Sequence, residues 1–183
     1  MNCYDLPTSI NANGQMLHIR NDGDWRMVVD VNIALSDVAL TEQERVIAAV
    51  AIFYDIPDLD NISDMQSAIE GMMQFIAAGT ENPIKKPKLL DWEEDAPLIV
   101  SGINAVIGKE VRAVGYMHWW TFIAAYMSIG DCALATVVSI RDKIARGKKL
   151  EKYEKDFKRD NPQYFNNKRE QQAAYDMLLE LIE

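Results

Sequence analysis

Apolar residues recur at helical spacing through most of this chain, in segments separated by glycine, proline and acidic residues. In residues 25–35, 46–53, 65–76 and 98–106 the apolar positions follow intervals of three and four, the period of a helix with one buried face. The pattern predicts a mainly α-helical fold of about six to seven helices. We treat residues 1–183 as a single domain, which is an ordinary length for one core.

Residues typical of helix N-caps precede several of these segments. Thr41 is followed by acidic residues at positions 42 and 44, and acidic side chains stabilise the first turn of a helix. Either Asp22 or Asp24 is expected to cap the helix whose apolar pattern begins at Trp25. For the segment that begins at Met65, the expected cap is Ser63 or Asp60.

Two regions depart from the helical pattern. Asn13-Gly14 lies between short apolar runs in residues 10–19, which is the strongest short-range signal for a β-hairpin. Residues 79–90 contain two prolines and three lysines without a period, so a surface loop and a candidate sub-boundary are expected there. A last helix is predicted through residues 175–182.

The stretch Y-M-H-W-W-T-F-I-A-A-Y-M, residues 116–127, gathers aromatic side chains around His118. We expect His118 to begin a helix and to bond a main-chain group or a carboxylate; a metal ligand or a base is the alternative. Trp120 lies off the main apolar stripe. The stripe itself, predicted to be core rather than an aromatic cage, consists of Trp119, Phe122, Ile123, Tyr126 and Met127.

An arginine stands in the next helix, which is expected to follow Gly130 with Asp131 as its N-cap and to bury Ala133, Val137, Ile140 and Ile144. If Arg141 is buried, it needs a carboxylate partner, and we predict Asp91 or Asp95 for that role. Alternatively, Arg141 projects from the edge of the stripe into water. Both aspartates belong to D-W-E-E-D, residues 91–95, whose acids are expected to stabilise the start of a helix rather than to act as an acid/base pair.

The charged residues are distributed unevenly along the chain. Residues 1–138 hold 8 Lys or Arg against 19 Asp or Glu, a net −11, whereas residues 139–183 hold 11 against 9, a net +2. The overall charge of −9 disfavours nucleic acid as a partner. The basic segment 141–159, with 9 Lys or Arg against 4 Asp or Glu, is expected to be a solvated helix face, with nucleic acid or an acidic partner as the alternative.

The sequence offers no recognisable site for a metal, a cofactor or catalysis. It has two histidines and two cysteines without the spacing of a zinc site, and it lacks the glycine-rich loops that bind nucleotide phosphates. We therefore predict no catalytic, cofactor-binding or metal-binding residues and no enzyme activity. Cys3 and Cys132 are expected to be free thiols, the apolar stretch 114–129 is too short for a membrane span, and the N-terminus lacks the features of a secretory signal.

Several motifs together resemble a known family. These are D-W-R at 24–26, A-V-A-I-F-Y-D-I-P at 49–57, D-W-E-E-D at 91–95, M-H-W-W-T-F at 117–122, and Ile140-Arg141. In this order they are similar to the phage proteins named for gene product fifteen, which occur in long-tailed phages and prophages of Gram-positive bacteria. The residues that carry the resemblance and are expected to form its structural signature are Asp91, Asp95, His118, Trp119, Trp120, Phe122 and Arg141.

The resemblance implies a role in tail assembly, because genes of this family typically lie beside those for the major tail protein and the tape-measure protein. It implies a chaperone in the cytoplasm of the bacterial host that binds the tape-measure or tail tube protein, with homo-oligomers as a further expectation. It also implies that the aromatic helix packs against the Arg141 helix and the D-W-E-E-D segment. The alternatives are a structural component retained in the tail and a hydrolase or nucleic-acid-binding factor that uses residues 141–159.

Overall fold

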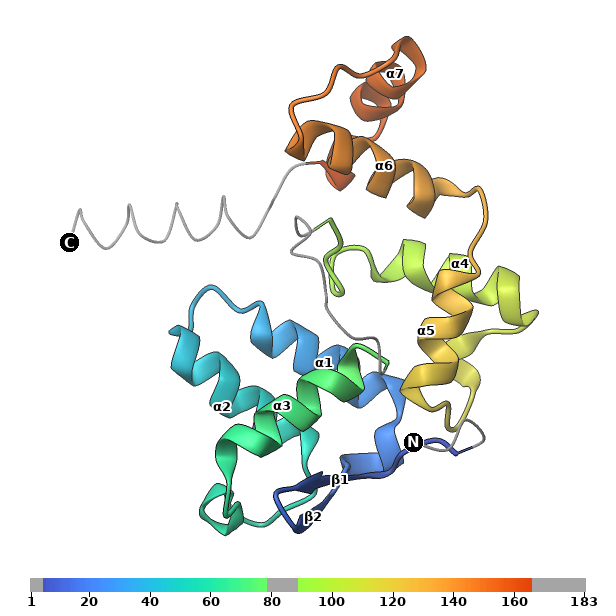
Figure 1. The fold of residues 1–183 in the computed structure, drawn as a ribbon. Helices are drawn as coiled ribbons and strands as arrows, with labels where there is room; N and C mark the ends of the chain where they lie inside the picture. Colours follow the sequence, from blue (N-terminus) through green and yellow to red (C-terminus); the bar gives the residue numbers. More distant parts are fainter. Residues whose placement is uncertain (1–4, 79–88, 166–183) are drawn as a thin grey trace, which may run out of the picture. The chain divides into compact units, whose positions relative to one another are not determined.

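A computed structural model describes residues 5–78 and 89–165 (Figure 1). Within these ranges the fold is mainly helical with a small N-terminal hairpin, which confirms the predicted fold class. The elements are β1 (Ser9–Ala12), β2 (Gln15–His18), α1 (Trp25–Leu35), α2 (Glu42–Phe53), α3 (Met65–Ile76), α4 (Ala96–Ile107), α5 (Trp119–Met127), α6 (Ala133–Ala145) and α7 (Lys152–Asp160). The helix predicted through 175–182 and most of the 79–90 loop lie outside the described residues.

The described chain falls into two compact units. Of the described residues, 5–78 and 103–129 form the first unit, and 89–102 and 130–165 form the second. The first unit therefore contains the hairpin, α1, α2, α3 and α5, and the second contains α6 and α7. The single-domain expectation stays a prediction.

The hairpin forms where Asn13-Gly14 predicts it. Asn13 and Gly14 both have positive φ, 51° and 94°, as a primed two-residue turn requires. β1 and β2 are antiparallel with Ala12 opposite Gln15 and Ser9 opposite His18. The side-chain oxygen of Asn11 accepts from the Gly14 amide at 2.7 Å and closes the turn.

The N-cap residues of α2 and α3 can be compared with those predicted from the sequence, and one prediction is wrong. Thr41 and Glu44 form a capping box at α2, as predicted. Asp64 caps α3 by accepting from the Ser67 amide, so the expectation of Ser63 or Asp60 is wrong. The reason is position: Asp64 directly precedes the helix, whereas the amide and hydroxyl of Ser63 both donate to Gln15.

Several residues assigned to buried stripes are exposed. Met127 is 77% exposed and Met73 49%, and Met65 and Ile144 also reach the surface. Met127 is the last residue of α5, and Met73 follows the fully buried Met72 on a helix that buries only one side. Helical spacing identifies the apolar direction of a helix, but it does not say how far along the helix the neighbours extend.

The second unit holds α7 against α6 through a buried carboxylate. Glu154 is 1% exposed, and its side chain accepts from Lys143 Nζ at 2.6 Å and from the Glu151 amide at 2.8 Å. The hydrogen bond from Lys143 and that from the Glu151 amide lower the pKa of Glu154. The helix α6 begins one residue later than predicted, because Cys132 rather than Asp131 occupies the N-cap.

Candidate functional site

The signature residues fall into two groups. His118, Trp119, Trp120 and Phe122 belong to the first unit, and Asp91, Asp95 and Arg141 belong to the second. In each group, buried or partly buried side chains bond main-chain atoms, and Phe122 adds ring packing to the first. The predicted packing of the aromatic helix on the Arg141 helix stays a prediction.

In the first unit two helix starts are joined to each other. Asp24 is the N-cap of α1 and His118 is the N-cap of α5, and the two residues form an antiparallel β-bridge. The Met117 amide donates to Asp24 Oδ2 at 3.0 Å, and the Trp25 amide donates to the Met117 carbonyl at 3.0 Å. These hydrogen bonds join residue 24 to residue 118, although about ninety residues separate them in the sequence.

His118 is neutral in this arrangement and has a defined tautomer. Its Nδ1 accepts from the Trp120 amide at 3.1 Å, which leaves Nε2 as the protonated nitrogen that donates to the Pro7 carbonyl at 3.0 Å. The side chain is fully buried, and burial lowers the pKa of His118 below its ordinary value. The prediction that His118 starts the helix and bonds a main-chain group is confirmed.

The two indoles after His118 bond the end of α3. Trp119 Nε1 donates to the Ile76 carbonyl and Trp120 Nε1 to the Phe75 carbonyl, both at 2.9 Å. The last carbonyls of a helix have no partner within the helix, and Trp119 supplies one for Ile76. Trp120 adds a second donor at Phe75, whose carbonyl also accepts from the Ala78 amide. Trp120 lies off the buried stripe, as expected, and its ring is partly exposed.

Aromatic stacking continues from α5 to α1. The ring of Phe122 lies parallel to that of Trp25, with centroids 4.6 Å apart, and 5.7 Å from that of Trp119. Trp119 and Phe122 are at most 2% exposed. These residues are therefore core, as the stripe predicts.

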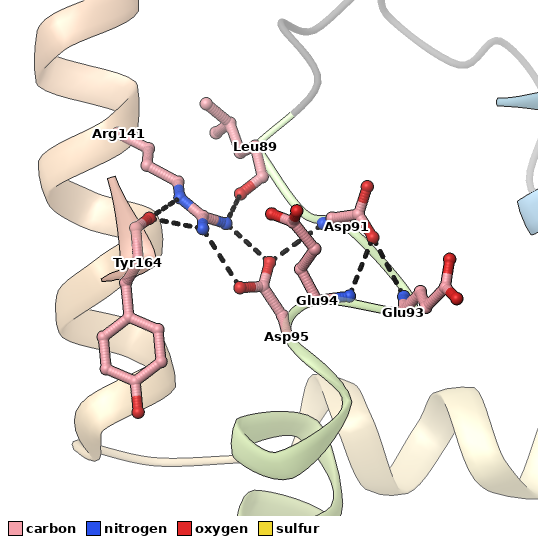
Figure 2. Close-up of polar contacts among 7 residues, drawn as sticks. All are labelled: Leu89, Asp91, Glu93, Glu94, Asp95, Arg141 and Tyr164. Atoms are coloured by element: carbon pink, nitrogen blue, oxygen red, sulfur yellow. Dashed lines mark hydrogen bonds and ion pairs between the residues drawn. The ribbon is translucent and has the colours of Figure 1, made fainter. Parts of the chain in front are cut away.

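In the second unit Arg141 and Asp95 form a buried, bidentate ion pair (Figure 2). Arg141 Nη1 lies 2.5 Å from Asp95 Oδ2, and Nη2 lies 3.0 Å from Oδ1. Asp95 is 1% exposed and the Arg141 side chain 20%. The structure thus selects Asp95 from the two predicted partners and excludes the alternative in which Arg141 projects into water.

The same guanidinium gathers main chain from two further segments. Its Nε and Nη2 donate to the Tyr164 carbonyl at 2.9 and 2.5 Å, and Nη1 donates to the Leu89 carbonyl at 3.0 Å (Figure 2). Arg141 therefore connects the segment before α4, helix α6 and the segment after α7.

Asp91 organises the segment that leads to Asp95. Its Oδ1 accepts from the amides of Glu93 and Glu94, both at 2.9 Å, while its own amide donates to Asp95 Oδ2 (Figure 2). The carboxylates of D-W-E-E-D thus shape the turn before α4, as the capping interpretation predicts, and Asp95 has the added role of holding Arg141.

The chemistry of both groups is structural. The ring nitrogens of His118 and the carboxylate of Asp95 are fully occupied by internal bonds. Across residues 5–78 and 89–165, no three His, Cys, Asp or Glu side chains lie close enough to hold a metal ion. No helix in the same ranges is sufficiently long and apolar to cross a membrane.

Comparison with known proteins identifies the family. The model of the family described as bacteriophage Gp15 protein matches residues 4–165. The chain belongs to this family. No curated protein and no solved structure matches the chain significantly. As a member of the Gp15 family, the chain is a phage protein, and the match extends over both groups of signature residues.

Sequence reasoning missed two residues of the first unit that support this group. Arg26 forms an ion pair with Asp24 at 3.1 Å and donates to the carbonyls of Arg112 and Val114, so it carries the turn before α5. Gly23 has a φ of 78°, and a Cβ there would lie 2.7 Å from Phe75 and 3.1 Å from His118. The D-W-R motif was the available signal, but its connection to His118 is a long-range contact that no local pattern reveals.

Proposed function

We propose that this Gp15-family chain is a tail assembly factor of a phage or prophage: a non-enzymatic chaperone that binds the tape-measure protein, the tail tube protein, or both. Membership of the family carries the proposal. The resemblance to this family implies a gene that lies beside those for the tape-measure protein and the major tail protein. Assembly would take place in the cytoplasm of the bacterial host.

The chemistry of the described residues is compatible with binding rather than catalysis. The signature side chains are engaged in internal bonds, so their contribution is to hold the two units in shape. Flexible apolar side chains are available at the surface, where Met16, Met73 and Met127 are 61%, 49% and 77% exposed. Methionine adapts to partners of varied sequence, which suits a protein that holds a long apolar client.

The direct test is co-expression with the tape-measure protein of the same phage, followed by affinity capture and light scattering of the recovered material. The proposal predicts a soluble complex where the tape-measure protein alone, or with an unrelated acidic protein of similar size, precipitates. Precipitation in all three cases would reject the chaperone role. Detection of the chain in purified virions would instead support a component retained in the tail.

Binding of nucleic acid through residues 141–159 is disfavoured because the three arginines and Lys143, four of the nine cations, are paired with carboxylates. Arg141 is paired with Asp95, Arg146 with Asp142, and Arg159 with Asp156 and Asp160. A carboxylate beside each guanidinium offsets the charge that a phosphate backbone would need. A salt-dependent shift of labelled DNA at micromolar protein would contradict this argument.

A further inference from the structure

An open groove of about 420 Å³ runs between β1 and α3 in the first unit. Figure 1 shows α3 alongside β1. One wall is formed by residues between Pro7 and Asn13, and Phe75 and Trp120 line the groove as well. The other wall is one face of α3, formed by Ser67, Glu70, Gly71 and Gln74.

The edge of β1 that borders this groove is open. Antiparallel strands alternate between pairs that exchange hydrogen bonds and pairs that do not, and Ile19 donates to the Thr8 carbonyl. By this alternation the main-chain groups of Ser9 and Asn11 point away from β2. Both residues line the groove, and no other described residue bonds their main-chain N–H or C=O groups. An unpaired strand edge is a template for another strand.

The groove is long enough for several extended residues. Asn13 bonds Asp64 at the start of α3, and Ile10 packs on Gly71 so closely that any side chain at Gly71 would overlap it. The four strand residues Ser9–Ala12 therefore run beside α3. At about 3.3 Å per residue they span roughly 13 Å, which accommodates a partner segment of roughly four to five residues.

The negative charge around the groove favours a positively charged partner. Among the described residues, Glu70 is the only charged side chain that lines the groove, and it is exposed. Residues 5–78 contain 12 Asp or Glu and 3 Arg, a net charge of −9, and no lysine. A segment with lysine or arginine would be attracted to this surface, whereas an acidic segment would be repelled.

We infer that this groove binds an extended, basic segment of a partner polypeptide, which pairs with β1 as a third strand. Main-chain bonds to Ser9 and Asn11 supply affinity, and a basic side chain beside Glu70 with an apolar one beside Trp120 supplies selectivity. The inference rests on the proposed function only in taking the segment from a tail protein. The pairing itself does not depend on it.

A fluorescence anisotropy assay with labelled peptides tests the pairing on the full chain. The probe is a peptide of alternating lysine and valine, about five residues long so that it covers the four-residue strand β1. It is expected to bind, and the matched glutamate–valine peptide is expected not to bind. N-methylation of alternate amides in the lysine–valine peptide removes donors to β1 and should weaken binding about tenfold. Equal affinity of the methylated and unmethylated probes would overturn strand pairing, without any change to the protein.

Two pairs of variants locate the binding. Ser9→Pro removes an N–H that points into the groove, while Met16→Pro removes the corresponding outward N–H on the opposite edge of the hairpin. Glu70→Lys reverses a charge in the groove, while Asp30→Lys makes the same change on α1, outside it. The groove variants should bind about tenfold more weakly and the controls as the unaltered chain. Circular dichroism confirms that each variant is folded, and equal affinity within a pair would overturn the inference.

The same variants separate this inference from the proposed function. If the unaltered chain keeps the tape-measure protein soluble and the groove variants do so equally well, the groove is not the client site but the chaperone role stands. If the chain does not solubilise the client yet binds the probe in the expected pattern, the chaperone role fails and the groove stands. Self-association that the groove variants abolish would identify a second copy as the occupant and overturn the assignment to a basic partner.

Discussion

Replacing Arg141 with methionine is expected to destabilise the second unit by about 3–5 kcal/mol, because it leaves a buried carboxylate without its counter-charge. Asp95 is 1% exposed and receives two hydrogen bonds from Arg141, so water cannot compensate for the loss. The carbonyls of Leu89 and Tyr164 lose their donors in the same variant. Methionine keeps the apolar stem of the side chain, which confines the change to the charge and its bonds.

Arg146→Met is the matched control on the same helix. Arg146 is 52% exposed and pairs with Asp142 at 2.8 Å, and exposed pairs of this kind contribute about 0–1 kcal/mol. Urea unfolding followed by circular dichroism should therefore separate the two variants by at least about 2 kcal/mol. Adding Asp95→Asn to Arg141→Met should restore part of the loss. Equal midpoints for the Arg141 and Arg146 variants would refute the argument that Asp95 depends on Arg141.

Three further predictions concern the first unit. Burial lowers the pKa of His118 below its ordinary value of 6.5. As the pH falls through 6.5, the unfolded chain therefore binds a proton before the folded chain does, and the stability of the fold decreases. Thermal melts between about pH 7 and 5 should show this loss of stability, and a His118→Asn variant should show less of it. Gly23→Ala, at φ 78° and in close contact with Phe75, should cost more than about 1 kcal/mol in urea unfolding, whereas Gly130→Ala, whose Cβ would meet nothing within 4 Å, should cost little. Trp120→Phe removes the Trp120 donor to the Phe75 carbonyl and should lower the free energy of unfolding in urea by about 1 kcal/mol. An unchanged free energy of unfolding would contradict a stabilising role for this bond.

Local chemistry made much of the fold predictable. Asn13-Gly14 and Thr41 act through neighbours within a few residues, so the hairpin and the start of α2 could be derived from the sequence. The Asp95–Arg141 pair was also predictable, because a cation in an apolar helix requires a carboxylate and D-W-E-E-D offered two well-placed candidates.

Long-range contacts account for what the sequence did not reveal. The bridge between Asp24 and His118 joins helix starts that are far apart in the chain, and the conformation of Gly23 matters only because His118 and Phe75 lie against it. The exposure of Met127 has the same origin, since spacing alone cannot show where the neighbours of a helix end. The groove beside β1 was not predicted either, because it arises from the packing of α3 on the hairpin.

The most direct test of the account is the solubility of the tape-measure protein when it is diluted from denaturant into buffer that contains increasing amounts of this chain. Light scattering reports aggregation, and centrifugation followed by quantification of the supernatant reports the protein that remains soluble. The proposed chaperone role predicts that scattering falls as the chain is added and reaches a plateau at a fixed ratio of the two proteins. Aggregation that is independent of the amount of chain added would contradict that role.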